Sequence, residues 1–141
     1  MAQTMQFDLV CPERRLASLK VTAVQIPGTE GDFTAMPGHM PLITTLRPGV
    51  LKVSGSDDDQ DFVVTGGFAE VGEGLTVLAE NAVLRSEMTQ SDFDEMMEEA
   101  ENAYGQVKEN FVSEPGPVDE AAKMMSDMVA LGDEIGLNAS R

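Results

Sequence analysis

The spacing of apolar residues changes once along this chain of 141 residues, near Arg85–Thr89. Before that point, apolar and polar residues alternate in short runs such as Met5–Cys11, which is typical of strands that bury one face. After it, apolar residues recur every three or four positions, which is typical of amphipathic helices. The change predicts two parts: a mainly β domain over residues 1–86 and a helical domain over 87–141.

The β domain is predicted to be a β-sandwich of about ten short strands. Turn residues separate its apolar runs, as at Pro27-Gly28, Pro48-Gly49 and Gly66-Gly67. Many short strands at regular spacing, divided by such turns, indicate a sandwich or a barrel. Four acidic residues lie within Asp57–Asp61, but their spacing is not that of a calcium-binding loop. We expect a solvated hairpin tip there.

The helical domain is predicted to be an antiparallel hairpin. Thr89 with Asp92, or Ser91 with Asp94, can form the N-terminal cap of the first helix. Proline and glycine in residues 113–117 separate the helices, and Pro117 suits the first turn of the second. Both helices have one apolar face, formed in the first by Phe93, Met96, Met97, Ala100, Ala103, Tyr104, Val107 and Phe111, and in the second by Val118, Ala121, Ala122, Met125, Val129 and Gly132.

The net charge of −16 is concentrated in the helical domain. Residues 1–85 hold six basic and eleven acidic side chains, a net of −5, and residues 86–141 hold three and fourteen, a net of −11. Without clustered Lys and Arg, the chain is a poor partner for nucleic acid or for an anionic membrane surface. It has no long apolar run and no signal-peptide pattern, so we expect neither membrane insertion nor export by that route.

Few side chains are suited to catalysis or to metal binding. His39 and Cys11 are the single histidine and cysteine, whereas metal sites commonly combine several such ligands. Cys11 continues the alternation of its run and is expected to be a small core residue. Neither a G-x-S-x-G elbow nor a P-loop is present. The residues predict no catalytic group, metal or cofactor, and they favour a binding or structural protein over an enzyme.

Two other functions stay open on the residues alone. One is a small cupin-like β enzyme that uses His39, which would require a bound metal. The other is a free acidic adaptor that binds a partner through a methionine-rich helical face, since the chain has ten methionines and methionine adapts to varied surfaces.

Several motifs in consistent order resemble the ε subunit of bacterial F-type ATP synthases. They are a Pro-Gly-His-x-Pro-Leu turn at Pro37–Leu42, Pro48-Gly49 before the next apolar run, and Gly-Gly-Phe-x-Glu-Val at Gly66–Val71. The resemblance covers residues 5–85 closely, and the helical part only in layout.

The resemblance implies a non-catalytic rotor subunit of the central stalk, peripheral on the cytoplasmic face of the inner membrane. Its implied partners are the γ subunit, the c ring and, transiently, the α and β catalytic subunits, in the coupling of hydrogen ion transport to ATP synthesis. The resemblance places an acidic turn at the c ring, formed by Glu30, Gly31 and Asp32. It places the Pro-Gly-His segment at γ, through His39, Met40, Pro41 and Leu42.

The helical part departs from the family pattern in two ways. In several relatives the first helix begins Ile/Leu-Asp-x-x-Arg-Ala, which contributes to ATP binding, but here Met97 stands at the arginine position and Glu98 at the alanine position. We therefore expect no useful ATP binding. The second helix offers Lys123 and Arg141 among many acidic residues, so we expect its docking on acidic catalytic subunits, and its inhibition of ATP hydrolysis, to be weak or absent.

Overall fold

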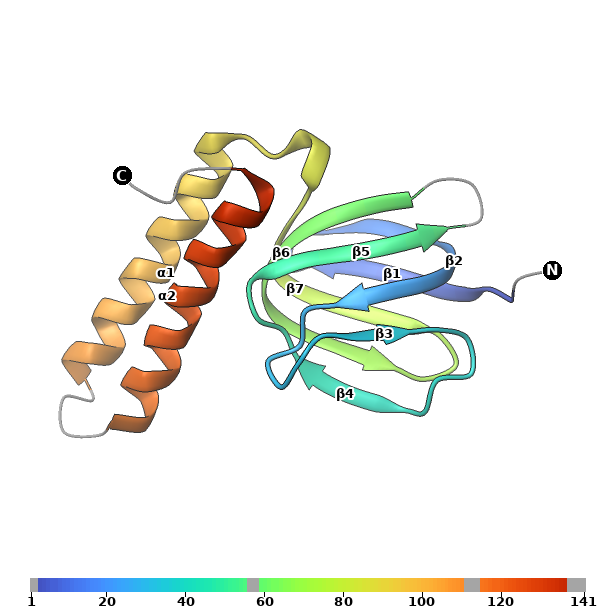
Figure 1. Cartoon of the computed structure of the whole chain (residues 1–141), viewed down its shortest axis with the longest axis horizontal. Helices are drawn as coiled ribbons and strands as arrows, with labels where there is room; N and C mark the ends of the chain where they lie inside the picture. The colour runs from blue at the N-terminus through green and yellow to red at the C-terminus, as the bar shows by residue number, and fades with distance from the viewer. Residues whose placement is uncertain (1–2, 56–58, 111–114, 137–141) are drawn as a thin grey trace. The chain divides into compact units, whose positions relative to one another are not determined.

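The computed structural model describes residues 3–55, 59–110 and 115–136, and it divides the chain into two compact units (Figure 1). The first unit, Met1–Glu87, is built from strands, and the second, Met88–Arg141, from two helices. The predicted fold class, a β-sandwich followed by a pair of helices, is confirmed.

The described residues of the first unit form seven strands: β1 (Met5–Cys11), β2 (Arg14–Ile26), β3 (Phe33–Ala35), β4 (Leu42–Thr45), β5 (Gly49–Gly55), β6 (Asp59–Val71) and β7 (Leu75–Leu84). Neighbouring strands are hydrogen-bonded in the order β1-β7-β6-β5-β2-β3, and β4 joins the edge of β6. Strand β1 also pairs with β2, so the sheet closes on itself. All pairs are antiparallel except β1 with β7.

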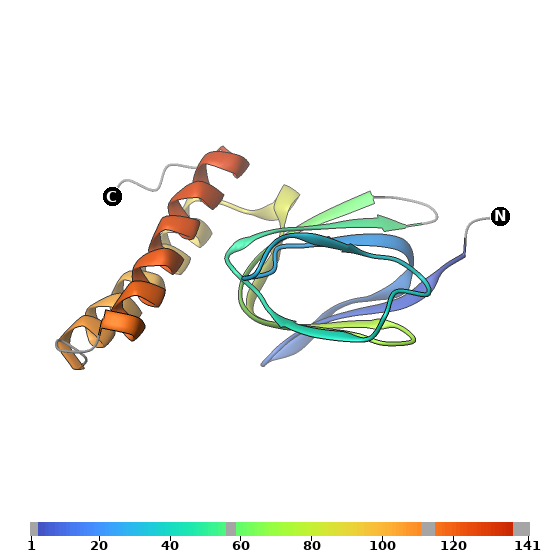
Figure 2. The same ribbon diagram turned by 60° about the horizontal axis from the view of Figure 1, so that its bottom comes forward.

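Two long strands each take part in both layers of the sandwich. Strand β2 pairs with β1 through Arg14–Val21 and then with β3 and β5 as far as Ile26. Strand β6 pairs with β5 through Asp59–Val64 and with β4 through Phe68–Val71. The view in Figure 2 looks into the closed unit, where the strands surround one interior. Residues 56–58, which include part of the predicted acidic hairpin tip, lie outside the described residues.

The described strands number seven rather than about ten. One reason is that Gly66-Gly67, expected to separate two strands, bends a single strand instead. Gly66 and Gly67 lie inside β6 with φ angles of 65° and 102°. Positive φ is readily adopted by glycine alone. The bend lets β6 continue from its pairing with β5 to its pairing with β4.

The interior of the sandwich is filled by the apolar residues of the alternating runs. Its fully buried side chains include Phe7, Leu9, Val21, Val24, Ile26, Leu51, Val64, Ala69 and Val77. Cys11 is partly buried and packs against this core, as predicted. At about 25 cal/mol for each Å² of apolar surface removed from water, this burial is the main stabilising contribution to the unit.

The second unit follows a short 3₁₀ turn, Arg85–Glu87, and consists of α1 (Gln90–Asn110) and α2 (Pro115–Ile135). A capping box starts α1: the Asp92 amide donates to Thr89 Oγ1 and the Thr89 amide to Asp92 Oδ2, both at 3.1 Å. Of the two predicted caps, the structure selects this one. Gly136, with a φ of 79°, lies directly after α2 and suits the left-handed end of a helix.

The two helices pack together along their apolar faces, but the predicted face of α2 is rotated slightly. Met128 is buried, whereas Val129 and Ala122 are exposed. Steps of three, four and three from Val118 give Ala121, Met125 and Met128, which are half-buried or buried, whereas steps of four, three and four give the exposed Ala122 and Val129. Both series fit the helical repeat, so packing decides between them. Phe111 lies outside the described residues. Within the described helices, none is both long and apolar enough to span a membrane.

Candidate interaction surface

One segment of the sandwich, residues 27–47, contains all seven residues predicted to contact partners. Its ends meet: the Arg47 amide donates to the Pro27 carbonyl oxygen at 3.0 Å, and Gly28 forms a β-bridge with Leu46. The segment includes β3 and β4. Both predicted contact sites therefore lie in one segment whose two ends are joined by backbone hydrogen bonds.

The Pro-Gly-His motif forms a tight turn. The His39 amide donates to the Met36 carbonyl oxygen at 3.0 Å, and Gly38 has a φ of 86°. Proline followed by glycine with positive φ is the pattern of a type II turn. The half-buried His39 ring lies 5.8 Å from the Phe33 ring, and its Nδ1 is 2.7 Å from the Met40 carbonyl oxygen. These contacts hold His39 against the protein and leave Met40 and Pro41 exposed.

The acidic turn lies at the other end of the segment. The Gly31 amide donates to the Gly28 carbonyl oxygen at 3.2 Å, which closes a turn with Glu30 at its tip. The Asp32 carboxylate accepts two hydrogen bonds from Arg47 Nη2, at 2.6 and 2.8 Å. The Phe33–His39 ring contact connects this turn to the Pro-Gly-His turn.

The structure adds apolar residues that sequence reasoning missed. Ile43, Phe68 and Leu78 lie on one outer face of the sandwich, because Phe68 pairs directly with Leu78 and diagonally with Ile43. Their intervening neighbours Ala69 and Val77 are buried. We define the outer apolar surface as these three residues together with Met36 and Met40, two exposed residues of the segment between β3 and β4. The alternation in Phe68–Val71 indicated one outward face, but only the register shows which strands share it.

The side chains of the outer apolar surface are large, apolar and exposed to solvent. Met40 and Ile43 expose 79% and 68% of their surface, and Phe68 and Leu78 each expose 38%. Single exposed apolar residues are common, but a group on one sheet face, such as Ile43, Phe68 and Leu78, is typical of a protein–protein contact. The arrangement is suited to burying apolar side chains against a partner.

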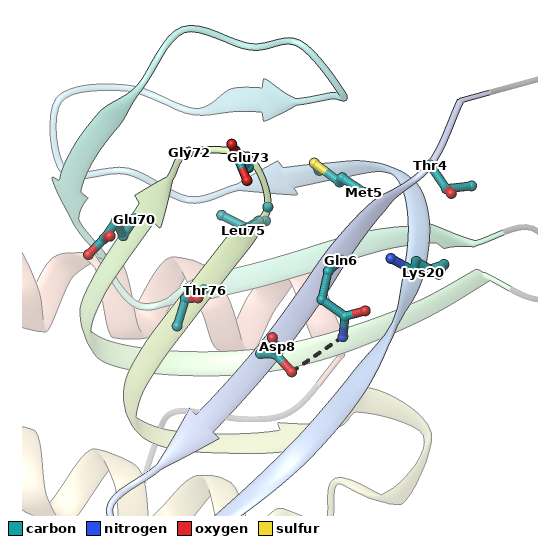
Figure 3. A pocket seen from close by; sticks show the side chains of 11 residues that line it. Thr4, Met5, Gln6, Asp8, Lys20, Glu70, Gly72, Glu73, Leu75 and Thr76 are labelled. Carbon is teal, nitrogen blue, oxygen red and sulfur yellow. Dashed lines mark hydrogen bonds between the residues drawn. The ribbon is translucent and has the colours of Figure 1, made fainter.

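A polar hollow of about 510 Å³ lies beside this surface, along β1, β6 and β7 (Figure 3). Its lining includes three carboxylates, from Asp8, Glu70 and Glu73, and the amine of Lys20. Glu70 pairs across the strands with Ile43, so the hollow adjoins the outer apolar surface. Gln6 Nε2 lies 3.5 Å from Asp8 Oδ1 and donates to Ser18 Oγ at 3.0 Å.

The described residues contain no group of three or more His, Cys, Asp or Glu side chains placed to bind a metal ion. Burial raises the pKa of the Cys11 thiol, so its thiolate fraction at neutral pH is small. His39 lies against a carbonyl oxygen and an aromatic ring rather than against a nucleophile. These surroundings do not activate either group for catalysis.

The helical segment that corresponds to the nucleotide motif has an apolar centre. Met97 is 2% exposed, and its thioether side chain offers no positive charge to a phosphate. The Asp94 carboxylate accepts a hydrogen bond from Gln90 Nε2 at 2.9 Å. The local contacts are those of a packed helix start.

The family model for the ATP synthase Delta/Epsilon chain, beta-sandwich domain, matches residues 4–85. The first unit is therefore a sandwich of the delta/epsilon type. The sequence is 56% identical over 138 residues to the ATP synthase epsilon chain of Ruegeria sp. (strain TM1040), a match that covers 97% of this chain and all of the relative. It is 52% identical to the epsilon chain of Rhodobacter capsulatus over the same shares of both chains. The chain belongs to the ATP synthase epsilon chains.

A solved structure shows the same fold. A chain in the Euglena gracilis mitochondrial ATP synthase, in a structure of its OSCP, F1 and c-ring, matches with a TM-score of 0.66 and 20% identity. The match covers 94% of this chain and 81% of that one. The helical part of our chain is thus included in the likeness as well as the sandwich.

Proposed function

We propose that this epsilon chain is a non-catalytic rotor subunit of the central stalk, which connects the γ subunit to the c ring during ATP synthesis. The outer apolar surface carries this proposal, because it provides exposed apolar area for a stable partner on a rigid sheet. The 27–47 segment adds the predicted γ contacts, from His39 to Leu42, and the predicted c-ring contacts, from Glu30 to Asp32. The subunit would act at the cytoplasmic face of the bacterial inner membrane as a peripheral protein.

The non-catalytic role is supported by the surroundings of the two reactive side chains. Cys11 is packed against the sandwich core with a raised pKa, and His39 is held in a turn. Catalysis requires a positioned nucleophile, base or metal. A protein with an exposed apolar sheet face, and with its cysteine and histidine in these surroundings, is better suited to binding than to catalysis.

Assembly with γ is the experiment that tests the function. Tagged protein expressed in its own bacterium should co-purify with γ and with the α and β subunits in stoichiometric amounts, as measured by mass spectrometry. A purified chain that turned over a substrate without partners, or that recovered no γ, would contradict the proposal.

The hairpin is expected to inhibit ATP hydrolysis weakly. The described part of α2 has one basic side chain, Lys123, whose Nζ is 3.4 Å from Asp127 Oδ2. Asp119 and Glu120 lie about one helical turn before Lys123, and Asp133 adds negative charge further along the helix. Like charges disfavour docking on acidic catalytic subunits. The predicted second basic residue, Arg141, lies outside the described residues.

Removal of residues 88–141 tests this expectation. In the purified complex, we expect ATP hydrolysis to rise by less than about twofold, because little docking energy is lost. The matched measurement is proton-driven ATP synthesis by the same preparation, which shows whether the complex is still coupled. A large rise in hydrolysis with coupling retained would show that the hairpin is an effective inhibitor.

The isolated protein is expected not to bind ATP usefully. Met97 offers no charge to the phosphates, and the neighbouring Glu98 adds a negative one. In a calorimetric titration with Mg-ATP, we expect no binding tighter than about 1 mM, which corresponds to about −4 kcal/mol. Micromolar binding would show that other residues form a nucleotide site.

A further inference from the structure

The two carboxylates of the acidic turn have different surroundings. Arg47 Nη2 donates to both oxygens of Asp32, and Arg47 Nε donates to Oδ1 at 3.2 Å. Such two-oxygen pairing is directional as well as electrostatic. The remaining terminal nitrogen, Nη1, donates to the Pro48 carbonyl oxygen at 3.2 Å. All three nitrogens of the Arg47 guanidinium therefore donate hydrogen bonds, two to Asp32 and one to the neighbouring Pro48.

Backbone hydrogen bonds and a contact between two threonine hydroxyls also hold the turn in place. The Thr29 amide donates to the Thr45 carbonyl oxygen at 3.0 Å, and the two threonine hydroxyl oxygens are 2.6 Å apart. The Arg47 amide donates to Pro27. Together with the Arg47–Asp32 ion pair, these contacts join both sides of the turn to Thr45 at the end of β4 and to Arg47 beyond it.

Glu30 lies at the tip of this fastened turn and is exposed. Within the described part of the chain, its carboxylate has no hydrogen-bond or ion-pair partner. The Asp32 side chain is 42% exposed, but its charge is opposed by an adjacent guanidinium. The outward negative charge of the turn therefore belongs mainly to Glu30.

We propose that Arg47 is a positioning residue that uses Asp32 to hold the turn, so that Glu30 alone presents the charge that meets a basic surface. This inference rests on the proposed rotor function, in which the turn contacts the c ring. It assigns Asp32 an internal role rather than a direct contact. An exposed carboxylate at an interface rim mainly sets association rate and salt dependence.

The test uses purified γ–epsilon complexes and detergent-solubilised c ring, with the dissociation constant measured at low and high KCl concentration. Four variants are compared with the wild type: Asp32→Asn, Arg47→Gln, the double variant, and Glu30→Gln. Amide hydrogen exchange of residues 28–32 is followed in parallel, because it reports whether the turn is held.

Asp32→Asn and Arg47→Gln should each weaken binding about threefold to fivefold and speed exchange in the turn, since an ion pair at a partly exposed site contributes up to about 1 kcal/mol. The double variant should be no weaker than either single variant, because the two residues act as one unit. Glu30→Gln should weaken binding about fivefold at low salt, leave exchange unchanged and remove most of the salt dependence.

Additive losses in the double variant, or a Glu30→Gln variant that binds within twofold of wild type, would overturn the assignment. An Asp32→Asn variant that loses the salt dependence while its exchange is unchanged would place Asp32 in direct contact instead. A wild-type complex that does not bind the c ring at all would contradict the proposed function itself, which separates the two failures.

Discussion

Replacement of Met40 by serine together with Ile43 by threonine is expected to weaken binding to γ roughly 100-fold, or about 2.7 kcal/mol. These are the most exposed residues of the outer apolar surface, at 79% and 68%. Burying most of two such side chains against a partner contributes about 2–4 kcal/mol. Threonine keeps the β-branched shape that suits β4. The dissociation constant can be measured by calorimetry with purified γ.

The helical unit supplies a matched control, because Met124 and Val129 on α2 are also exposed, at 39% and 45%. Met124→Ser with Val129→Thr makes the same kinds of chemical change on the other unit, and we expect the affinity for γ to change less than twofold. Neither pair should alter the thermal stability of the free protein much, since both lie on the surface. Equal losses from both pairs would show that the outer apolar surface is not the main γ contact.

Replacement of Gly67 by alanine is expected to destabilise the sandwich by about 3–4 kcal/mol. Gly67 has a φ of 102°, which a residue with a side chain rarely adopts, and an added Cβ would overlap the Leu78 carbonyl oxygen on β7. The clash is with backbone, so no side-chain rotation can relieve it. For a unit of this size the loss should lower the unfolding temperature of the full-length protein by about 15–25 °C in scanning calorimetry.

Gly72 provides the control for this substitution. It lies between β6 and β7, its φ is not positive, and an added Cβ would meet no atom within 4 Å. Gly72→Ala should therefore change the free energy of unfolding by less than about 0.5 kcal/mol. If Gly67→Ala lowered the free energy of unfolding no more than Gly72→Ala does, β7 would have to move to make room for the new side chain, which would contradict this prediction.

The order of strands and helices was accessible from local patterns. Residues alternate in Met5–Cys11 because successive side chains of a strand face opposite sides. After Phe93 apolar residues recur every three or four positions because those positions share one face of a helix. The capping pair Thr89 and Asp92 was also accessible, because its residues are three apart in the same turn. The buried face of α2 was misplaced by one residue at Val129, since Met128 is equally apolar and only packing distinguishes them.

The candidate surface was only partly accessible. The motif around His39 predicted partner contacts in the 27–47 segment, but nothing local in the sequence associates Ile43 with Phe68 and Leu78. Those contacts depend on the register of β4, β6 and β7, which pairs residues far apart along the chain. The same holds for Arg47 and Asp32, which are fifteen positions apart and meet because the backbone closes at Pro27.

The amino-acid order alone therefore specified the β and helical halves, the acidic balance and the position of the main turns, because each of these depends on neighbours a few residues away. The folded sandwich was needed to show that one glycine pair bends a strand, that three apolar side chains share an outer face, and that one of the two carboxylates of the acidic turn is already paired. Strand register and loop closure produce those features, and both are properties of contacts between distant segments.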